Sequence, residues 1–206
     1  MQRLIFTFAL ICWVIASTAH SQTSPPEVLK SAHEGLQSFL SRVPLEARGH
    51  YGFTRSDDFQ QARLGTALNL YTITPQSLLT YSADTPVTSL LSKTAMWYFP
   101  VMVHNEIRAI LVVDQVDGQW QAVSLGYAEL ARALDRVGQR WPQAEGFHPQ
   151  LIAVFQAKEY LVWVPEYSSD DLISIFPPGL ELMGGSNAAG VIERLKPVVK
   201  EAIQHR

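Results

Sequence analysis

Cysteine is almost absent from this chain of 206 residues, and the single cysteine, Cys12, lies in an apolar run near the N-terminus. Because Ile11 precedes it instead of a small residue, we do not expect Cys12 to carry a lipid. If the run is removed as an export signal, the mature chain has no thiol and forms no disulfide. A thiol nucleophile is then excluded, and the core alone must stabilise the fold.

Charge of either sign is also scarce. The chain has 16 Lys and Arg residues against 19 Asp and Glu residues, which gives a net charge of −3. Without an excess of basic residues to displace counterions from phosphates, we predict no binding to nucleic acid. Hydrophobic residues make up 47% of the chain, so it folds around a core. Repeats, heptads and low-complexity tracts are missing, and the length predicts a single domain.

Motifs for metals are missing as well. The histidines beyond residue 21 form no His-x-x-x-His pair, so the sequence predicts no zinc site. Asp114 and Asp117 superficially suggest a calcium loop, but Val116 and Trp120 break the alternation of acids that such a loop needs. A tight hairpin turn explains the two acids, and we predict neither a metal nor a cofactor.

One glycine-rich segment, residues 184–190, leads into a predicted helix. It lacks the lysine of a P-loop, and it does not have the glycine that should follow the serine of a nucleophile elbow. We therefore interpret Ser186 or Asn187 as the N-cap of the helix rather than as part of a site.

The N-terminus carries the pattern of an export signal. Arg3 supplies a positive charge, residues 4–16 form an apolar run, and Ala19 and Ser21 have the spacing of small residues that a signal peptidase accepts. At 13 residues the run is shorter than the roughly 20 that cross a bilayer. The alternative is an uncleaved N-terminal anchor.

We accordingly interpret residues 1–21 as a signal peptide that is cleaved near Ser21/Gln22. The protein is then periplasmic or secreted, and it contacts the membrane only through the signal peptide before cleavage. The remaining chain contains no Asn-x-Ser/Thr acceptor, which together with the lack of disulfides favours a bacterial origin.

The clearest structural pattern is in residues 95–125. Apolar, β-branched runs at 95–103, 107–116 and 119–125 are separated by the turn pairs His104-Asn105 and Asp117-Gly118, which predicts a three-strand antiparallel meander. Pro100 cannot donate a ladder hydrogen bond, so it must lie at an edge or a bulge.

Elsewhere the periodicity predicts further elements. These are helices over 26–43, 127–141 and 187–204 (the last with a kink or break at Pro197), a strand at 64–73 followed by a short helix from Thr74, and a second hairpin at 151–156 and 160–164. Because the links between strands are short, the sheet must be mainly antiparallel. We predict a single α+β domain over 22–206, with helices packed on the faces of the sheet.

Three tryptophans, Trp97, Trp120 and Trp163, fall on predicted strands. An exposed row of aromatic rings would stack sugars, but aromatic residues on strands are more often buried. Their neighbours are equally apolar, so we predict that the tryptophans belong to the core.

Hydrophobic burial does not account for the segment 46–63. It brings aromatic, cationic and anionic groups together in His50, Tyr51, Arg55 and Asp57. Binding sites often use such loops on a rigid scaffold, so these four residues are our candidates for ligand or partner binding. The alternative is a solvated connector.

Two functions remain open from the sequence. The first is a non-enzymatic exported domain that binds an unknown protein, glycan or small molecule. The second is an extracytoplasmic hydrolase whose catalytic residues are scattered along the chain. A pocket with two facing carboxylates, or with a serine and a histidine in contact, would favour the hydrolase. An aromatic-lined groove without such a pair would favour the binding domain.

Overall fold

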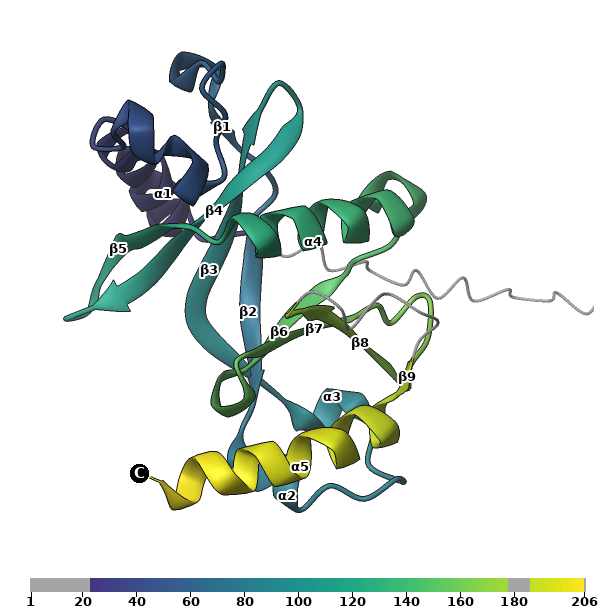
Figure 1. Ribbon diagram of the computed structural model, residues 1–206. Coiled ribbons are helices and arrows are strands. Elements are labelled where there is room, and N and C mark those ends of the chain that lie inside the picture. The colour runs from purple at the N-terminus through teal and green to yellow at the C-terminus, as the bar shows by residue number, and fades with distance from the viewer. Residues whose placement is uncertain (1–22, 178–185, 206) are drawn as a thin grey trace, which may run out of the picture.

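The computed structural model describes residues 23–177 and 186–205 (Figure 1). The predicted signal peptide, with Cys12, and residues 184–185 of the glycine-rich segment lie outside the described residues. The helices are α1 (Pro26–Leu40), α2 (Pro75–Leu79), α3 (Val87–Leu90), α4 (Ala128–Arg140) and α5 (Ala188–Gln204). The strands are β1 (Arg63–Leu64), β2 (Leu68–Ile73), β3 (Leu91–Val103), β4 (Glu106–Val116), β5 (Gln119–Gly126), β6 (Gln150–Val154), β7 (Glu159–Trp163), β8 (Asp171–Phe176) and β9 (Ser186–Asn187).

The strands are joined in the order β5-β4-β3-β2-β6-β7-β8-β9, and β1 also pairs with β3. Of the strand pairs in the described part of the chain, only β2 with β6 is parallel. The fold is therefore α+β with a mainly antiparallel sheet, as the pattern predicts. The parallel pair and strand β8 were not anticipated.

Pro100 lies in the long strand β3 at the point where β3 changes its pairing partner from β2 to β1. On one side of β3, pairing with β2 ends at Tyr98 and pairing with β1 begins at Val101, so Pro100 falls between the two partners. The carbonyl oxygen of Pro100 accepts a hydrogen bond from the Gly65 N–H at 2.7 Å. On the other side, the register with β4 shifts between Val101 and Met102. The missing N–H of proline thus costs no ladder bond.

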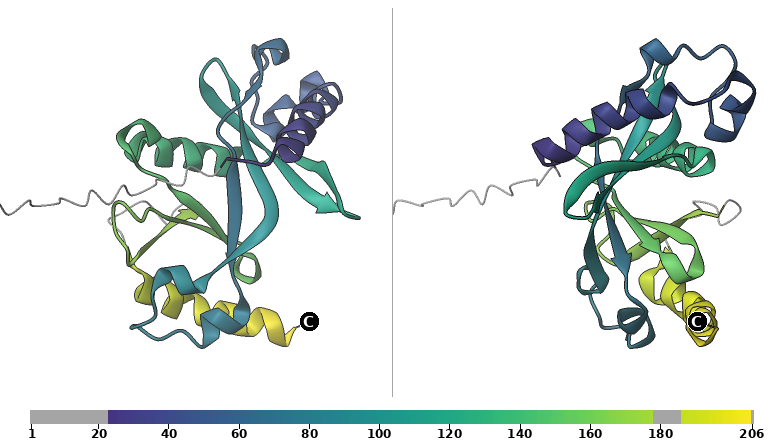
Figure 2. Two further views of the ribbon diagram at one scale, coloured as in Figure 1. Left: turned by 180° about the vertical axis from the view of Figure 1, so that it is seen from behind. Right: turned by 90° about the vertical axis from the view of Figure 1, so that its left-hand side faces the viewer.

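Helices cover both faces of the sheet (Figure 2). On β4, Leu111 faces the cluster under α1, whereas its neighbours Ile110 and Val112 face the cluster under α4, as the strand pleat requires. Helix α5, with α2 and α3, packs on β6, β7 and β8 at the other end. Trp97 and Trp163 are buried in these clusters, as predicted, and Trp120 is partly buried.

Several helix boundaries differ from the prediction. Helix α1 ends at Leu40 instead of 43, and the strand predicted over 64–73 is divided into β1, which ends at Leu64, and β2, which begins at Leu68. Helix α5 runs through Pro197 without a break. Its N-cap is Asn187, whose side-chain oxygen accepts the Ala189 N–H at 2.6 Å, as predicted.

Candidate functional site

The segment 46–63 is packed and hydrogen-bonded. Asp57 is only 3% exposed, and its carboxylate accepts the Thr54 N–H at 2.7 Å. The same carboxylate lies 3.2 Å from Nε of Arg108 on β4. A carboxylate that is buried and paired in this way is not offered to a ligand. Asp57 therefore anchors the segment to the sheet.

Apolar contacts complete this anchor. Phe53 is buried, and its ring meets the edge of Phe59 at 4.9 Å. The Arg48 guanidinium stacks over Phe59 at 4.0 Å and donates a hydrogen bond to the Asp57 carbonyl at 2.9 Å. Gly52, at φ +91°, lies so close to β4 that a Cβ would overlap a carbonyl oxygen there. Apart from Phe53 and Asp57, the residues of the segment are exposed or half-buried, so hydrophobic burial accounts for only part of it.

The four residues predicted for binding do not converge. His50 is exposed and Tyr51 is half-buried against the cluster under α1. Arg55 is exposed, and its backbone carbonyl accepts a hydrogen bond from Arg48. Asp57 is buried, and of the four predicted residues only His50 lines a cleft. Most of the wall of that cleft comes from other elements.

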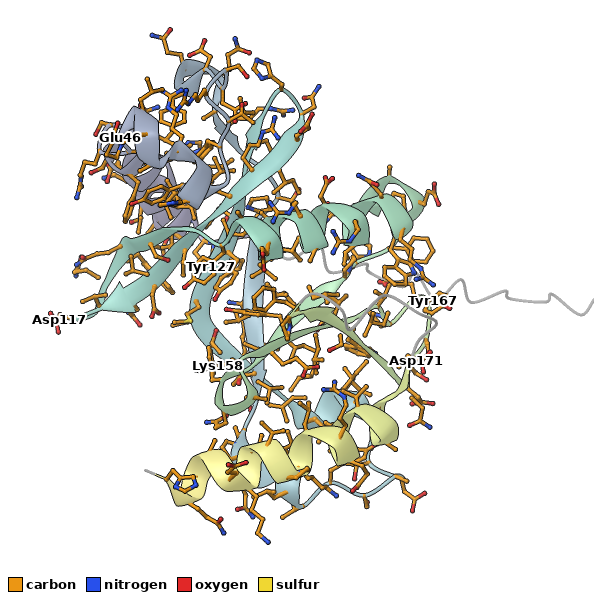
Figure 3. All side chains as sticks on the ribbon, in the orientation of Figure 1. Glu46, Asp117, Tyr127, Lys158, Tyr167 and Asp171 are labelled. Atoms are coloured by element: carbon orange, nitrogen blue, oxygen red, sulfur yellow. The ribbon has the colours of Figure 1, made fainter. Side chains whose placement is uncertain are left out.

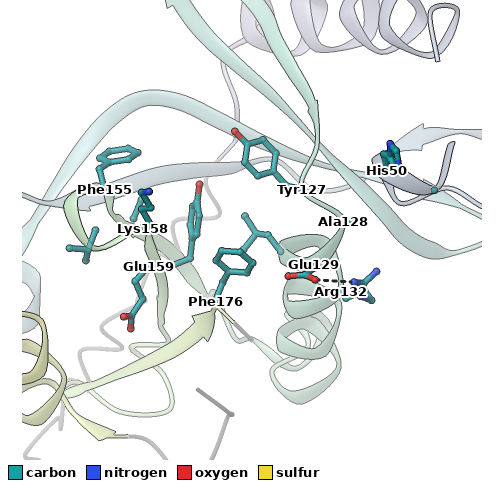
Figure 4. A pocket seen from close by; sticks show the side chains of 14 residues that line it. His50, Tyr127, Ala128, Glu129, Arg132, Phe155, Lys158, Glu159 and Phe176 are labelled. Carbon is teal, nitrogen blue, oxygen red and sulfur yellow. Dashed lines mark ion pairs between the residues drawn. The ribbon is translucent and has the colours of Figure 1, made fainter. Parts of the chain in front are cut away.

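That cleft has a volume of about 600 Å³. It lies between the start of α4, the turn from β6 to β7, and the end of β8, with Tyr127 and Lys158 both in its lining (Figures 3 and 4). Its lining residues are Gly49, His50, Tyr127, Ala128, Glu129, Leu130, Arg132, Ala153, Val154, Phe155, Lys158, Glu159, Tyr160 and Phe176. A volume of this size suits a small organic molecule.

Aromatic rings form much of the cleft wall. Tyr160 and Phe176 meet edge to face at 6.0 Å, and Tyr98 lies behind them with its ring 6.1 Å from Tyr160 and 6.3 Å from Tyr127. Tyr127 is 48% exposed and Phe155 is 45% exposed. Two large aromatic side chains at one cleft with half their surface in water are not explained by core packing.

The backbone of Tyr127 is strained. Its φ of 57° and ψ of 42° are left-handed, and for a bulky residue this costs about 1 kcal/mol or more. His104, Asn105 and Asp117 also have positive φ, but they lie in tight hairpin turns that favour it. Tyr127 instead precedes α4, so the prediction that it belongs to the helix is wrong. Strain of this kind is often retained at functional positions.

The phenols of the cleft are hydrogen-bond donors. The hydroxyl oxygens of Tyr98 and Tyr160 are 3.0 Å apart. Burial raises the pKa of both phenols, and in Tyr98 the hydrogen bond with Tyr160 raises it further. Both groups therefore stay protonated at neutral pH, so neither acts as a base or a phenolate nucleophile.

The two carboxylates of the cleft wall each have an arginine partner. Glu159 is 4% exposed, receives hydrogen bonds from Ser174 and Arg194, and lies 2.9 Å from one guanidinium nitrogen. The hydrogen bond with Glu159 raises the pKa of Arg194, so the pair holds α5 against β7 as two charges. Glu129 lies 3.9 Å from Arg132 in an exposed pair.

Lys158 is the remaining charged residue of the lining. It occupies a left-handed position, φ 52°, at the end of the turn from β6 to β7. Figure 4 shows its side chain beside Phe155, on the side of the cleft opposite Glu129 and Arg132. Among the described residues, no carboxylate forms an ion pair with Lys158.

A second hollow of about 360 Å³ lies under α4. Its wall includes Met102, Leu134, Val137 and Trp141, and none of its lining residues is charged. Its polar side chains are limited to Thr66, Gln143 and the indole of Trp141, so it offers few groups to orient a ligand. The aromatic cleft is therefore the stronger candidate site.

Neither a metal-binding cluster nor a membrane-spanning helix is found within residues 23–177 and 186–205. No three His, Cys, Asp or Glu side chains of these residues gather closely enough to hold a metal ion. None of the helices in the same ranges has the length and apolar character needed to cross a bilayer.

Comparison of the chain with protein families, with curated proteins and with solved structures finds no match.

Proposed function

We propose that this chain is an exported, non-enzymatic binding domain whose cleft binds a small organic molecule with a flat apolar or aromatic body. The observation that carries the proposal is the convergence of four aromatic rings on one hollow of about 600 Å³. Tyr127 comes from the start of α4, Phe155 and Tyr160 from the β6–β7 hairpin, and Phe176 from the end of β8. Rings offered from separate elements hold a flat ligand by stacking and edge contacts.

The size and wall of the cleft favour a small molecule over the other ligands that the sequence left open. A protein partner needs roughly 800 Å² of surface on each side, which a hollow of this kind does not offer. A glycan needs many hydrogen-bonding groups, whereas Leu130, Ala153 and Val154 add aliphatic surface to the aromatic rings. A ligand with a flat apolar body fits such a wall best.

The hydrolase alternative has less support. The described lining residues include no serine, so His50 has no hydroxyl nucleophile beside it to activate. Glu159 is held by Arg194, so the cleft does not offer two free carboxylates that face each other. The hydroxyls of the lining belong to the phenols Tyr127 and Tyr160, and burial raises the pKa of the Tyr160 phenol.

Export is the part of the proposal that rests on the N-terminal sequence. Residues 1–21 combine a positive charge, a short apolar run and small residues at the cleavage spacing. We therefore place the mature domain in the periplasm or outside the cell. There it would meet its ligand without a cofactor and without nucleic acid.

Two naphthalene probes of equal shape, 2-naphthamide and 2-naphthoate, test the proposed binding by calorimetric titration of the mature chain. We expect saturable binding to one site, weakened about tenfold by Phe155→Ala because a stacking ring is lost. The matched control is Tyr167→Ala, which removes a ring that is similarly exposed (48%, against 45% for Phe155) but lies outside the cleft. If neither probe binds, or if both variants weaken binding equally, the cleft is not the site.

A further inference from the structure

We propose that the ligand of the aromatic cleft carries a carboxylate and that Lys158 binds this group. The inference rests on the proposed function, since it specifies the chemistry of the molecule in that cleft.

The charged lining residues, taken together with Arg194 behind Glu159, leave one positive charge without an ion-pair partner, that of the exposed Lys158. Glu159 has its guanidinium partner in Arg194, and the Glu129 carboxylate has its partner in Arg132. These four charges sum to zero. Lys158 then adds one positive charge that no carboxylate among the described residues pairs with. A ligand with a single negative charge complements this wall, whereas a cation would be repelled.

The tyrosine pair leaves a hydrogen-bond donor on the same hairpin. Tyr98 is 3% exposed, and among the described residues its hydroxyl has no hydrogen-bond partner except Tyr160. When Tyr98 donates its proton to the Tyr160 oxygen, the Tyr160 O–H remains available to donate into the cleft that Tyr160 lines. Both hydroxyl protons can then take part in hydrogen bonds. A carboxylate oxygen is the acceptor that such a donor binds most strongly.

Lys158 lies at one side of the cleft, so the acid group that it binds would lie there while the ring of the ligand lies among the aromatic side chains. In Figure 4 Lys158 and Phe155 lie at one side of the cleft, while Glu129 and Arg132 lie at the other, with Tyr127 and Phe176 between them. A flat ring held among the aromatic side chains can therefore direct its acid group toward the ammonium of Lys158. Glu159, the next residue along the strand, does not compete for the ammonium because Arg194 holds its carboxylate.

The two naphthalene probes separate charge from shape, because 2-naphthoate is an anion at pH 7 and 2-naphthamide is neutral. We expect the mature chain to bind 2-naphthoate about tenfold more tightly, the effect of one charge-assisted hydrogen bond. Lys158→Gln should remove this preference, and Lys158→Arg should keep it. Lys200→Gln, which removes an exposed lysine of α5 outside the cleft, should also keep it.

The outcomes distinguish this inference from the proposed function. If the amide and the acid bind the wild-type chain equally, the cleft binds aromatic molecules but not through an acid, and only the inference is overturned. If Lys158→Gln keeps the preference for the acid, Lys158 is not the residue that recognises it. If neither probe binds, the proposed function fails and the inference fails with it.

Discussion

The carboxylate of Asp57 ties the segment after α1 to strand β4. It accepts the Thr54 N–H and faces the Arg108 guanidinium from a position that is almost fully buried. Asp57→Asn would keep the shape but leave the guanidinium without its buried partner. We expect a loss of about 2 kcal/mol in the free energy of unfolding, measured by urea titration.

Asp117→Asn is the matched control, since it removes the same charge from an exposed hairpin turn in which asparagine is equally favoured. It should change the free energy of unfolding by less than about 0.5 kcal/mol. Equal effects of the two substitutions would mean that Asp57 is not a structural anchor.

Glu166 makes the free energy of unfolding depend slightly on pH. Desolvation acts to raise the pKa of Glu166, but hydrogen bonds from the backbone and ring of His148 outweigh it, so the pKa lies below its usual value. The stabilisation is therefore complete above the pKa of the unfolded carboxyl and is lost as the pH falls through the lowered folded pKa. Because the pair is largely solvated, it contributes less than about 1 kcal/mol.

Urea unfolding of the wild-type chain and of Glu166→Gln between pH 7 and about pH 3 tests this sign. The wild-type chain should be more stable near neutrality, and the difference should vanish at the acid end. Glu201→Gln on α5 removes an exposed carboxyl as a control. A difference that grows as the pH falls would contradict the assignment.

At the scale of elements, helix α1 packs against β5 at a glycine. The Ser31 hydroxyl donates to the Trp120 carbonyl at 2.8 Å, and a Cβ on Gly35 would overlap the Cβ of Ala122. Gly35→Ala should therefore lower the free energy of unfolding by about 1 kcal/mol or more, although alanine is the better helix former.

The same substitution in α4, Gly138→Ala, meets no atom within 4 Å. It should raise the free energy of unfolding by about 0.5–1 kcal/mol. Thermal or urea unfolding of the two variants should thus give opposite signs. Stabilisation by both would show that α1 is not packed closely on β5.

Elements with local signals could be predicted from the sequence, and elements that depend on distant partners could not. The helices and the antiparallel strands have periodic apolar residues and turn pairs such as Asp117-Gly118, so the α+β class follows from them. The parallel pairing of β2 with β6 joins Tyr71 to Ile152, and no local pattern marks it. The anchoring of 46–63 depends on Arg108, which is also distant in sequence from Asp57.

The candidate site was missed for the same reason. The spacing of Tyr127 places it on the apolar face of the predicted helix. Only its position after Gly126 indicates a left-handed backbone conformation. Phe155 and Lys158 lie in an unremarkable hairpin turn. Their meeting with Phe176 requires β8 to pair with β7, and the sequence pattern does not predict β8. Of the predicted site residues, His50 alone lines the cleft.

At the scale of the whole molecule, the proposal of an exported domain depends on removal of the N-terminal segment. We expect mass spectrometry of the protein from its native host to give a chain that starts near Gln22. That chain would lack Cys12, so a thiol-reactive reagent should leave its mass unchanged. A protein that retains Met1 would contradict export by cleavage.

The central claim, that the aromatic cleft is the binding site, is tested most directly by amide chemical shifts of the ¹⁵N-labelled mature chain during titration with 2-naphthoate. We predict that the shifts concentrate in residues 126–132, 153–160 and 174–176, which carry most of the cleft wall. Shifts centred on residues 53–58, or on the second hollow around Leu134 and Trp141, would contradict the claim. The absence of any saturable shift would contradict it as well.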